Sequence, residues 1–263
     1  MGVFLDVNEV AAGYGKRKVL RGASMRTLKP GTVTGLLGPN AAGKSTLMTT
    51  LAGIRKPMAG EIALTRDNER VVGSELRDVV GYVPQDLPAS ASLTAFESVL
   101  VSGRRAGRLR VRGSEIEHTA AVLRKVGIEH LADRFVGELS GGQRQLVAVA
   151  QMFVRDPEVM LLDEPTSALD LRHQVELLQL VRAEVASRSS LALVAIHDLN
   201  LAARYCDELV MLHDGHVVAQ GSPADVLTPD LLARVYGIRA RVLNDGGVPV
   251  VCPIEEDQVS EAA

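Results

Sequence analysis

The stretch TVTGLLGPNAAGKST, Thr32–Thr46, decides the fold, because a short apolar run leads directly into a glycine-rich turn. The turn at Gly38–Ser45 fits the pattern G-x-x-x-x-G-K-[ST] of the phosphate-binding loop, or P-loop. Glycines let backbone N–H groups curl around phosphate oxygens, and the N-terminus of a following helix adds its positive dipole end. We therefore predict a strand, a phosphate-binding loop and a helix in this order.

Individual residues of this loop have distinct expected roles. Lys44 is expected to reach the β- and γ-phosphates of ATP, and the Ser45 hydroxyl is expected to ligate Mg²⁺. Ala41 stands where many related loops have glycine; if this position needs a positive φ, alanine costs about 1 kcal/mol. The residues of the loop expected to contact ATP are Gly38, Pro39, Asn40, Ala41, Ala42, Gly43, Lys44, Ser45 and Thr46.

Two further apolar runs end in candidate functional residues. VMLL at Val159–Leu162 leads into Asp163 and Glu164. LALVAI at Leu191–Ile196 leads into His197. Short runs that are apolar on both faces are typical of buried parallel strands. Because ligands of open α/β sheets bind at the carboxyl ends of the strands, the loop and these residues are expected to meet at one edge.

The three polar residues at these strand ends suit ATP hydrolysis. A carboxylate beside a P-loop can hold the hydration shell of Mg²⁺, which is the role expected for Asp163, and a second can polarise water, which is the role expected for Glu164. His197 could donate to a γ-phosphate oxygen. Acids that close a strand often only bind water or cap a helix, and a lone histidine among six is usually structural. The nearby P-loop favours the functional interpretation.

The rest of the chain of 263 residues predicts an α/β protein with an inserted helical part. The expected fold is a P-loop NTPase core with a mainly parallel sheet, an N-terminal antiparallel β region and a helical subdomain. SLTAFESVLVSGR and SEIEHTAAVLRKVGI place apolar residues at i, i+3 and i+4, and Ser114 with Glu117 fits a capping box. SPADVLTPDLLARVYG predicts one or two short helices, and RVLNDGGVPVVCP predicts a hairpin that turns at Asp245–Gly247.

We expect one domain with four parts along the chain. The core is expected in residues 1–85 and 159–221, and the helical subdomain in 86–158. The C-terminal helices, the hairpin and a disordered acidic tail, EEDQVSEAA, are expected in 222–263.

Composition excludes several classes of function. A net charge of -3, 3% aromatic residues and no tryptophan argue against nucleic acid as a partner. No apolar run approaches the roughly 18 residues needed to span a bilayer, and the N-terminus has no signal-peptide pattern. Any connection to a membrane is therefore expected to go through a partner protein. Cys206 and Cys252 form no CxxC pair and are expected to be reduced thiols.

The motif LSGGQRQ at Leu139–Gln145 narrows the prediction further, since it lies before a predicted helix and before Asp163. This order of motifs resembles the ABC ATPase family, and the resemblance covers nearly the whole chain. A serine and two glycines ahead of a helix make a second anion-binding N-terminus. The resemblance implies that this signature loop caps the γ-phosphate bound to the opposite subunit, through Ser140, Gly141, Gly142 and Gln143.

The resemblance also assigns roles to single residues elsewhere. It implies that Tyr14 stacks on adenine and that Gln85, in YVPQD, senses Mg²⁺ and the permease. It implies that Asp170, in SALD, lies at the dimer interface and that His197 is the switch histidine. ATP and Mg²⁺ are the expected ligands, with Ser45, Gln85 and Asp163 at the metal and Glu164, His197 and Lys44 as the catalytic set.

Several sequence segments resemble one branch of the family. YVPQ followed by SLTAFESVLVSGR, then LDLRHQ and HDLNLAARYCDELVMLHDGHVVAQGSPADVL, is similar to importers of iron chelates, haem and vitamin B12. The segment after Gln85 is more similar to ferric-siderophore systems, while haem or cobalamin import remains an alternative. A soluble ABC ATPase without a permease is a second alternative. A P-loop kinase or GTPase is disfavoured, because no NKxD-like element is present.

The resemblance implies partners and a location. The partners are a second copy in a head-to-tail ATP-sandwich dimer, integral-membrane permease subunits and, indirectly, a substrate-binding protein. The expected place is the cytoplasmic side of the inner membrane. A basic run could be a solvated loop or could lie near the anionic inner leaflet; it comprises Arg104, Arg105, Arg108, Arg110 and Arg112.

Overall fold

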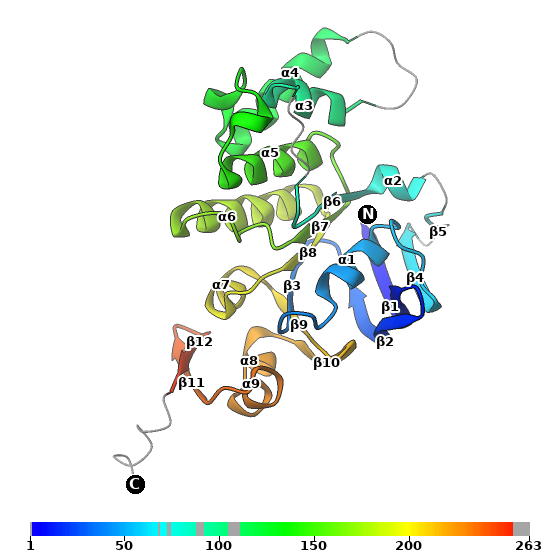
Figure 1. Cartoon of the computed structure of the whole chain (residues 1–263), viewed down its shortest axis with the longest axis vertical. Helices are drawn as coiled ribbons and strands as arrows, with labels where there is room; N and C mark the ends of the chain where they lie inside the picture. The colour runs from blue at the N-terminus through cyan, green and yellow to red at the C-terminus, as the bar shows by residue number, and fades with distance from the viewer. Residues whose placement is uncertain (1, 68, 73–74, 88–91, 105–110, 255–263) are drawn as a thin grey trace.

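A six-stranded sheet in the order β10-β9-β3-β8-β7-β6 runs through the centre of the computed structural model, which describes residues 2–67, 69–72, 75–87, 92–104 and 111–254 (Figure 1). Its strands are parallel except for β10, which pairs antiparallel with β9. All residues of β3, β7 and β8 are buried, as their apolar runs predicted. The strands are β3 (Val33–Leu37), β6 (Val80–Val83), β7 (Val159–Asp163), β8 (Leu191–Ala195), β9 (Glu208–His213) and β10 (His216–Gly221).

A second, antiparallel sheet covers one side of this core. Its order is β2-β1-β4-β5, with β1 (Val3–Tyr14), β2 (Arg17–Leu28), β4 (Ala59–Arg66) and β5 (Glu69–Arg70). Helix α1 (Lys44–Leu51) contacts strands of both sheets. Leu47 and Met48 of α1 share one apolar core with residues of both sheets. The expected α/β P-loop fold, with its mainly parallel sheet and N-terminal antiparallel region, is confirmed.

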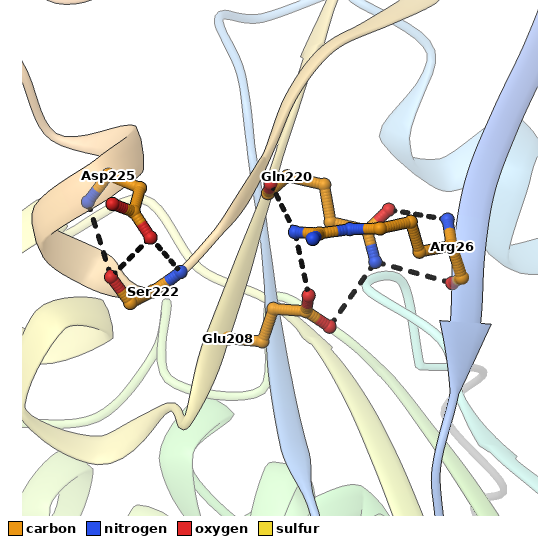
Figure 2. Close-up of polar contacts among 5 residues, drawn as sticks. All are labelled: Arg26, Glu208, Gln220, Ser222 and Asp225. Atoms are coloured by element: carbon orange, nitrogen blue, oxygen red, sulfur yellow. Dashed lines mark hydrogen bonds and ion pairs between the residues drawn. The ribbon is translucent and has the colours of Figure 1, made fainter.

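A polar junction joins the two sheets where β2 passes β10 (Figure 2). The Arg26 backbone N–H donates to Gln220 Oε1 at 2.7 Å, and Gln220 Nε2 donates to the Arg26 carbonyl at 3.2 Å. Glu208 accepts from both side chains, at 3.2 Å each. The Gln220 amide thus replaces a strand residue in the ladder and links the β1–β2 hairpin to the core.

Among the described residues, four α-helices lie between β5 and β7, and those labelled α3, α4 and α5 form the upper lobe in Figure 1. Within the described residues no helix has both the length and the apolarity to cross a bilayer. The four helices between β5 and β7 are α2 (Glu75–Val79), α3 (Ala95–Ser102), α4 (Gly113–Val126) and α5 (Gly141–Phe153), and the same stretch contains the 3-10 turns η1 (Glu129–Leu131) and η2 (Val136–Glu138).

The expected capping box at Ser114 and Glu117 is wrong. Helix α4 begins at Gly113, and the Glu115 carboxylate accepts from the Arg112 backbone N–H at 2.8 Å. The chain enters the helical conformation earlier than predicted, so Ser114 already lies inside the first turn and cannot cap it. Of the basic run, Arg105, Arg108 and Arg110 lie outside the described residues, so its two interpretations remain open.

The core continues through α6 (Leu171–Arg188) and α7 (Leu199–Tyr205), and the predicted C-terminal elements follow. They are α8 (Pro223–Val226), α9 (Pro229–Tyr236), β11 (Ala240–Asp245) and β12 (Val248–Pro253). Asp245 pairs with Val248 across a turn in which Gly246 and Gly247 have positive φ, as expected of the hairpin. The acidic tail at 255–263 lies outside the described residues.

Both cysteines carry free thiols, as expected. Cys206 is buried in the core, and this burial raises its pKa to about 12. A thiol that stays protonated is a poor nucleophile, so Cys206 acts as an apolar core residue.

Candidate active site

A cavity of about 820 Å³ opens at the carboxyl edge of the central sheet, between the P-loop and the β1–β2 hairpin. Ten of the residues predicted to act on ATP line it. They are Tyr14, Asn40, Ala41, Gly43, Lys44, Ser45, Thr46, Gln85, Glu164 and His197. The expectation that three strand ends meet at one edge therefore agrees with the geometry of the cavity.

The P-loop turns sharply between β3 and α1, and its glycines permit the turn. Gly38 has a φ of 149°, and a Cβ there would lie 2.2 Å from the Leu212 carbonyl oxygen. Gly43, which caps α1, has a φ of 108°. A side chain at either position would strain the backbone, and at Gly38 it would also collide with β9.

Ala41 adopts a φ of 64°, so this position does need the left-handed conformation in which an alanine is strained. Such a conformation costs an L-residue about 1–2 kcal/mol, while glycine pays about 0.4–1 kcal/mol in unfolded-state entropy. Ala41→Gly is therefore expected to raise the free energy of unfolding by about 0.5–1 kcal/mol in urea titrations. Ala42→Gly is the matched control: Ala42 is buried without positive φ, so this variant should be destabilised. A loss of stability in Ala41→Gly would contradict the assignment of strain.

Lys44 is a buried cation that bonds to its own loop. Its side chain is 5% exposed, and Nζ donates to the carbonyl oxygens of Gly38 at 2.8 Å and Pro39 at 3.3 Å. Burial lowers the pKa of Lys44, while the charges of Glu164 and Asp163 act in the opposite direction. The same ammonium lies 3.9 Å from Glu164 Oε1. The positive charge is thus placed at the loop, where a phosphate chain would need it.

Glu164 stands where three strand ends converge. Gln85, after β6, donates from Nε2 to Glu164 Oε2 at 2.8 Å. His197, after β8, places Nε2 2.5 Å from Glu164 Oε1. Glu164 itself has a φ of 53°, and its backbone N–H donates to the Ala195 carbonyl at 3.2 Å. A carboxylate oriented by an amide and an imidazole, in a cavity beside a P-loop, can orient and polarise a water molecule.

Asp163 lies beneath the cavity and does not line it. It is 1% exposed; burial raises its pKa, and hydrogen bonds from Ser45 and Tyr82 and the charge of Lys44 counteract part of this rise. Its Oδ1 atom is buried without a hydrogen-bond partner among the described residues. A buried carboxylate oxygen that lacks a donor, next to a serine hydroxyl, fits the outer hydration shell of Mg²⁺.

The described residues contain no group of three or more His, Cys, Asp and Glu side chains that could hold a metal by themselves. Mg²⁺ usually binds through one or two protein oxygens together with water and substrate phosphates, and Ser45 and Asp163 offer such oxygens. The residues present therefore fit a magnesium ion that arrives with a nucleotide.

The signature loop and Asp170 lie outside the cavity. The Ser140 hydroxyl caps α5 by accepting from the Gln143 N–H at 3.3 Å, and Gln143 Oε1 accepts from the Ser140 N–H at 3.0 Å. Asp170 caps α6, and the hydrogen bond from the His173 N–H is the main reason why its pKa is lowered. These residues are thus absent from the lining of the cavity that the P-loop of the same chain forms.

One arginine that contacts a residue of the cavity, Arg55, was not predicted from the sequence. The Arg55 guanidinium lies 3.9 Å from the centroid of the Tyr14 ring, and Nη1 donates to the Gly13 carbonyl at 2.6 Å. Tyr14 is 57% exposed at the cavity, whereas Arg55 does not line it. Arg55 therefore stabilises the ring from outside the cavity. No pattern signals this pair, because the two residues lie far apart in the sequence.

Charged residues after Tyr14 were also missed. Arg17, Lys18 and Arg21 line the cavity, together with Asp214. The basic run GKRKVLR at Gly15–Arg21 was the available signal. That these residues line the same cavity as the P-loop could not be deduced from the sequence. It depends on how β2 packs against the β9–β10 hairpin, where the Arg21 N–H donates to the Gly215 carbonyl.

Comparison with known proteins agrees with this geometry. The ABC transporter family matches residues 20–167. The ferric enterobactin transport ATP-binding protein FepC of Escherichia coli is 35% identical over 97% of this chain and 95% of its own. The hemin import ATP-binding protein HmuV of Bordetella avium is 38% identical over 91% of this chain and 94% of its own. The cobalamin import ATP-binding protein BtuD of Halobacterium salinarum is 39% identical over 90% of this chain and 60% of its own.

A solved structure extends the comparison to the fold. An ATP-binding cassette determined as a dimer in a post-hydrolysis state with ADP and Pi has a TM-score of 0.74 and is 27% identical, over 83% of this chain and 98% of its own. The matched family, the similarity along nearly the full length of FepC and HmuV, and the shared fold lead to one conclusion. This chain belongs to the ABC transporter family and is one of its ATP-binding, ATP-hydrolysing proteins.

Proposed function

We propose that this chain is the ATP-hydrolysing subunit of a membrane importer and that the importer carries iron-siderophore complexes. The observation that carries the ATPase part is Glu164, which Gln85 and His197 orient inside a cavity that the P-loop also lines. The cavity volume of about 820 Å³ suits a nucleoside triphosphate. The cargo part is supported by similarity to the ferric enterobactin protein FepC along nearly the whole chain.

In the proposed reaction each side chain acts on a defined part of ATP. Tyr14 stacks on the adenine ring, and Lys44 turns from the carbonyls of Gly38 and Pro39 to the β- and γ-phosphates. Glu164 orients the attacking water in line with the γ-phosphate and takes up its proton, while His197 donates to a γ-phosphate oxygen. Backbone N–H groups of the loop, from Gly38 to Thr46, surround the phosphate oxygens.

Mg²⁺, when bound with ATP, neutralises charge that develops on the phosphate oxygens. The residues proposed to hold it are Ser45 directly, with Asp163 and Gln85 through its water shell. The partnerless Oδ1 atom of Asp163 supports this assignment.

The separation between the P-loop and the signature loop supports a dimer. Ser140, Gly141, Gly142, Gln143 and Asp170 do not line the cavity, so we propose that they complete the ATP site of a second copy. Ser140 and Gln143 already form a capped helix N-terminus, which is an anion-binding arrangement. Similarity to a cassette that was solved as a dimer supports the same assembly.

We propose that permease subunits bind beside Gln85, at the cytoplasmic side of the inner membrane. A cavity of about 120 Å³ lies between the segment after Gln85 and the helices; Leu87, Ser98, Val136 and Gln151 are among its lining residues. Closure of the dimer would move these helices and the permease together.

The proposed division of the chain is one domain, with a core in 1–85 and 159–221, a helical subdomain in 86–158 and a C-terminal part in 222–263. A substrate-binding protein takes part indirectly, and nucleic acid does not.

The cargo is tested by ATP-driven uptake into proteoliposomes that hold this chain, its co-purified permease and its binding protein. We expect uptake of a ferric siderophore that ATP drives and that Glu164→Gln abolishes, with little uptake of haem or cobalamin. Haem or cobalamin uptake instead would correct the cargo and keep the ATPase role, since HmuV and BtuD are also similar proteins. ATP hydrolysis without uptake of any of the three would contradict the importer branch.

A further inference from the structure

Tyr236, at the end of α9, contacts the first residue of the P-loop. The Gly38 N–H donates to the Tyr236 hydroxyl oxygen at 3.0 Å. On its other side, the Gly38 carbonyl accepts from Lys44 Nζ at 2.8 Å, and the Leu212 carbonyl leaves no room for a Cβ. The entry of the phosphate-binding loop is therefore fixed by β9, by its own lysine and by a residue from the C-terminal part of the chain.

The structure holds Tyr236 firmly in this place. Leu231, Leu232 and Val235 bury one face of α9 in the main core, and the helix ends at Gly237 in a left-handed cap. Burial raises the pKa of Tyr236 to about 12, although the Gly38 N–H opposes this rise. The phenol therefore stays neutral around pH 7, and its oxygen accepts from Gly38 without bringing a negative charge near the phosphates.

The same C-terminal part also binds the helix that follows His197. The Asn200 side chain pairs with the backbone of Val251: the Val251 N–H donates to Oδ1 at 2.7 Å, and Nδ2 donates to the Val251 carbonyl at 3.3 Å. Arg204, also on α7, forms an ion pair of 2.7 Å with Asp245 in the hairpin. The segment Pro223–Pro253 thus touches both the loop that binds phosphate and the helix next to the γ-phosphate contact.

We propose that Pro223–Pro253 is a brace for the ATP site and that Tyr236 is the positioning residue through which it holds the P-loop. The proposal rests on the proposed role of the P-loop in ATP binding. Without the hydroxyl, the Gly38 N–H would be left buried without a partner, which a structure avoids by moving the group toward water. Such a movement would displace the first residue of the loop, so that the loop would be disordered before ATP arrives.

Tyr236→Phe tests this directly, because it removes one oxygen and preserves the ring that packs against the core. We expect the Kd for ATP to rise about five- to tenfold, as for the loss of one hydrogen bond with an orphaned donor. The Kd for inorganic tripolyphosphate should rise by the same factor, since the affected contacts are those to phosphate. Tyr205→Phe is the matched control: Tyr205 ends α7 at the opposite end from His197, and its variant should bind both ligands normally.

A second measurement follows the hydrogen bond itself. The Gly38 amide, followed by NMR, should exchange slowly with solvent in the wild-type protein, and at least tenfold faster in Tyr236→Phe. Fast exchange in the wild-type protein would overturn the proposal.

The two possible failures are distinguishable. Unchanged Kd values in Tyr236→Phe, while Lys44→Ala loses ATP binding, would overturn the brace and leave the ATP site intact. Normal ATP binding by Lys44→Ala would instead remove the proposed function on which the brace rests. A weaker affinity for ATP with an unchanged affinity for tripolyphosphate would also contradict the proposal, because the effect would then lie at the base.

Discussion

Glu164→Gln is expected to bind ATP normally and to hydrolyse it at least 100-fold more slowly than the wild type. The amide nearly matches the carboxylate in shape and can keep the contacts with Gln85 and His197, but it cannot take up a proton from the attacking water. Removal of the charge also leaves Lys44 free of its 3.9 Å partner, which favours the ATP-bound state. Phosphate release under single-turnover conditions measures the rate, and an ATP titration measures binding.

The same variant reports on assembly. ATP that is bound and not hydrolysed should hold two copies together, so light scattering should give twice the monomer mass only with ATP. Adding Ser140→Arg to Glu164→Gln should keep the protein monomeric, because a bulky side chain would then occupy the capped N-terminus of α5. The control for charge is Glu158→Gln, at a part-exposed position before β7 that pairs with Arg66. Hydrolysis at the wild-type rate by Glu164→Gln would disprove the role of this carboxylate.

Lys44→Ala should lose ATP affinity by about 100-fold or more, corresponding to about 2.7 kcal/mol. Lys44 is the buried cation among the P-loop residues, and its removal takes a charge-assisted contact from the phosphates. It also leaves Glu164 without its neighbouring positive charge, so the carboxylate should repel ATP. Titration with a fluorescent ATP analogue measures the change. Lys56→Ala, at an exposed position after α1, is the control and should bind ATP as the wild type does. Equal affinities of the two variants would contradict the assignment.

The parts of the fold that the sequence predicted well are those in which local pattern and burial agree. The runs before Gly38, Asp163 and His197 are apolar on both faces, and a buried parallel strand is the simplest structure that such runs form. Their common edge then follows from the geometry of open α/β sheets. The Ser114 prediction failed for a complementary reason: S-x-x-E also occurs inside a first helical turn, and only backbone geometry tells the two apart.

Other features depend on contacts between residues far apart in the sequence. The amide of Gln220 joins two sheets by imitating a strand residue, a role that no local pattern marks. Arg55 reaches Tyr14, and Tyr236 reaches Gly38, only because separate elements pack side by side. The ion-pair and hydrogen-bond partners of Glu164 were individually predicted as site residues, but their mutual contacts depend on loop geometry after three different strands. Polar contacts of this kind form only once the elements have packed together, so a local sequence pattern does not predict them.

The position of β3 in the sheet has a consequence for the protein during its synthesis. Both neighbours of this strand, β8 and β9, come much later in the chain. At about 5–20 residues per second, the ribosome needs roughly 8 to 30 seconds for the intervening stretch of about 150 residues. Until then β3, all of whose residues are buried in the folded protein, has neither of its pairing partners, and the adjoining loop lacks the strands that enclose it. Nascent chains that stop before β8 should therefore be prone to aggregation and dependent on chaperones, and ATP could begin to protect them only after β9 has emerged.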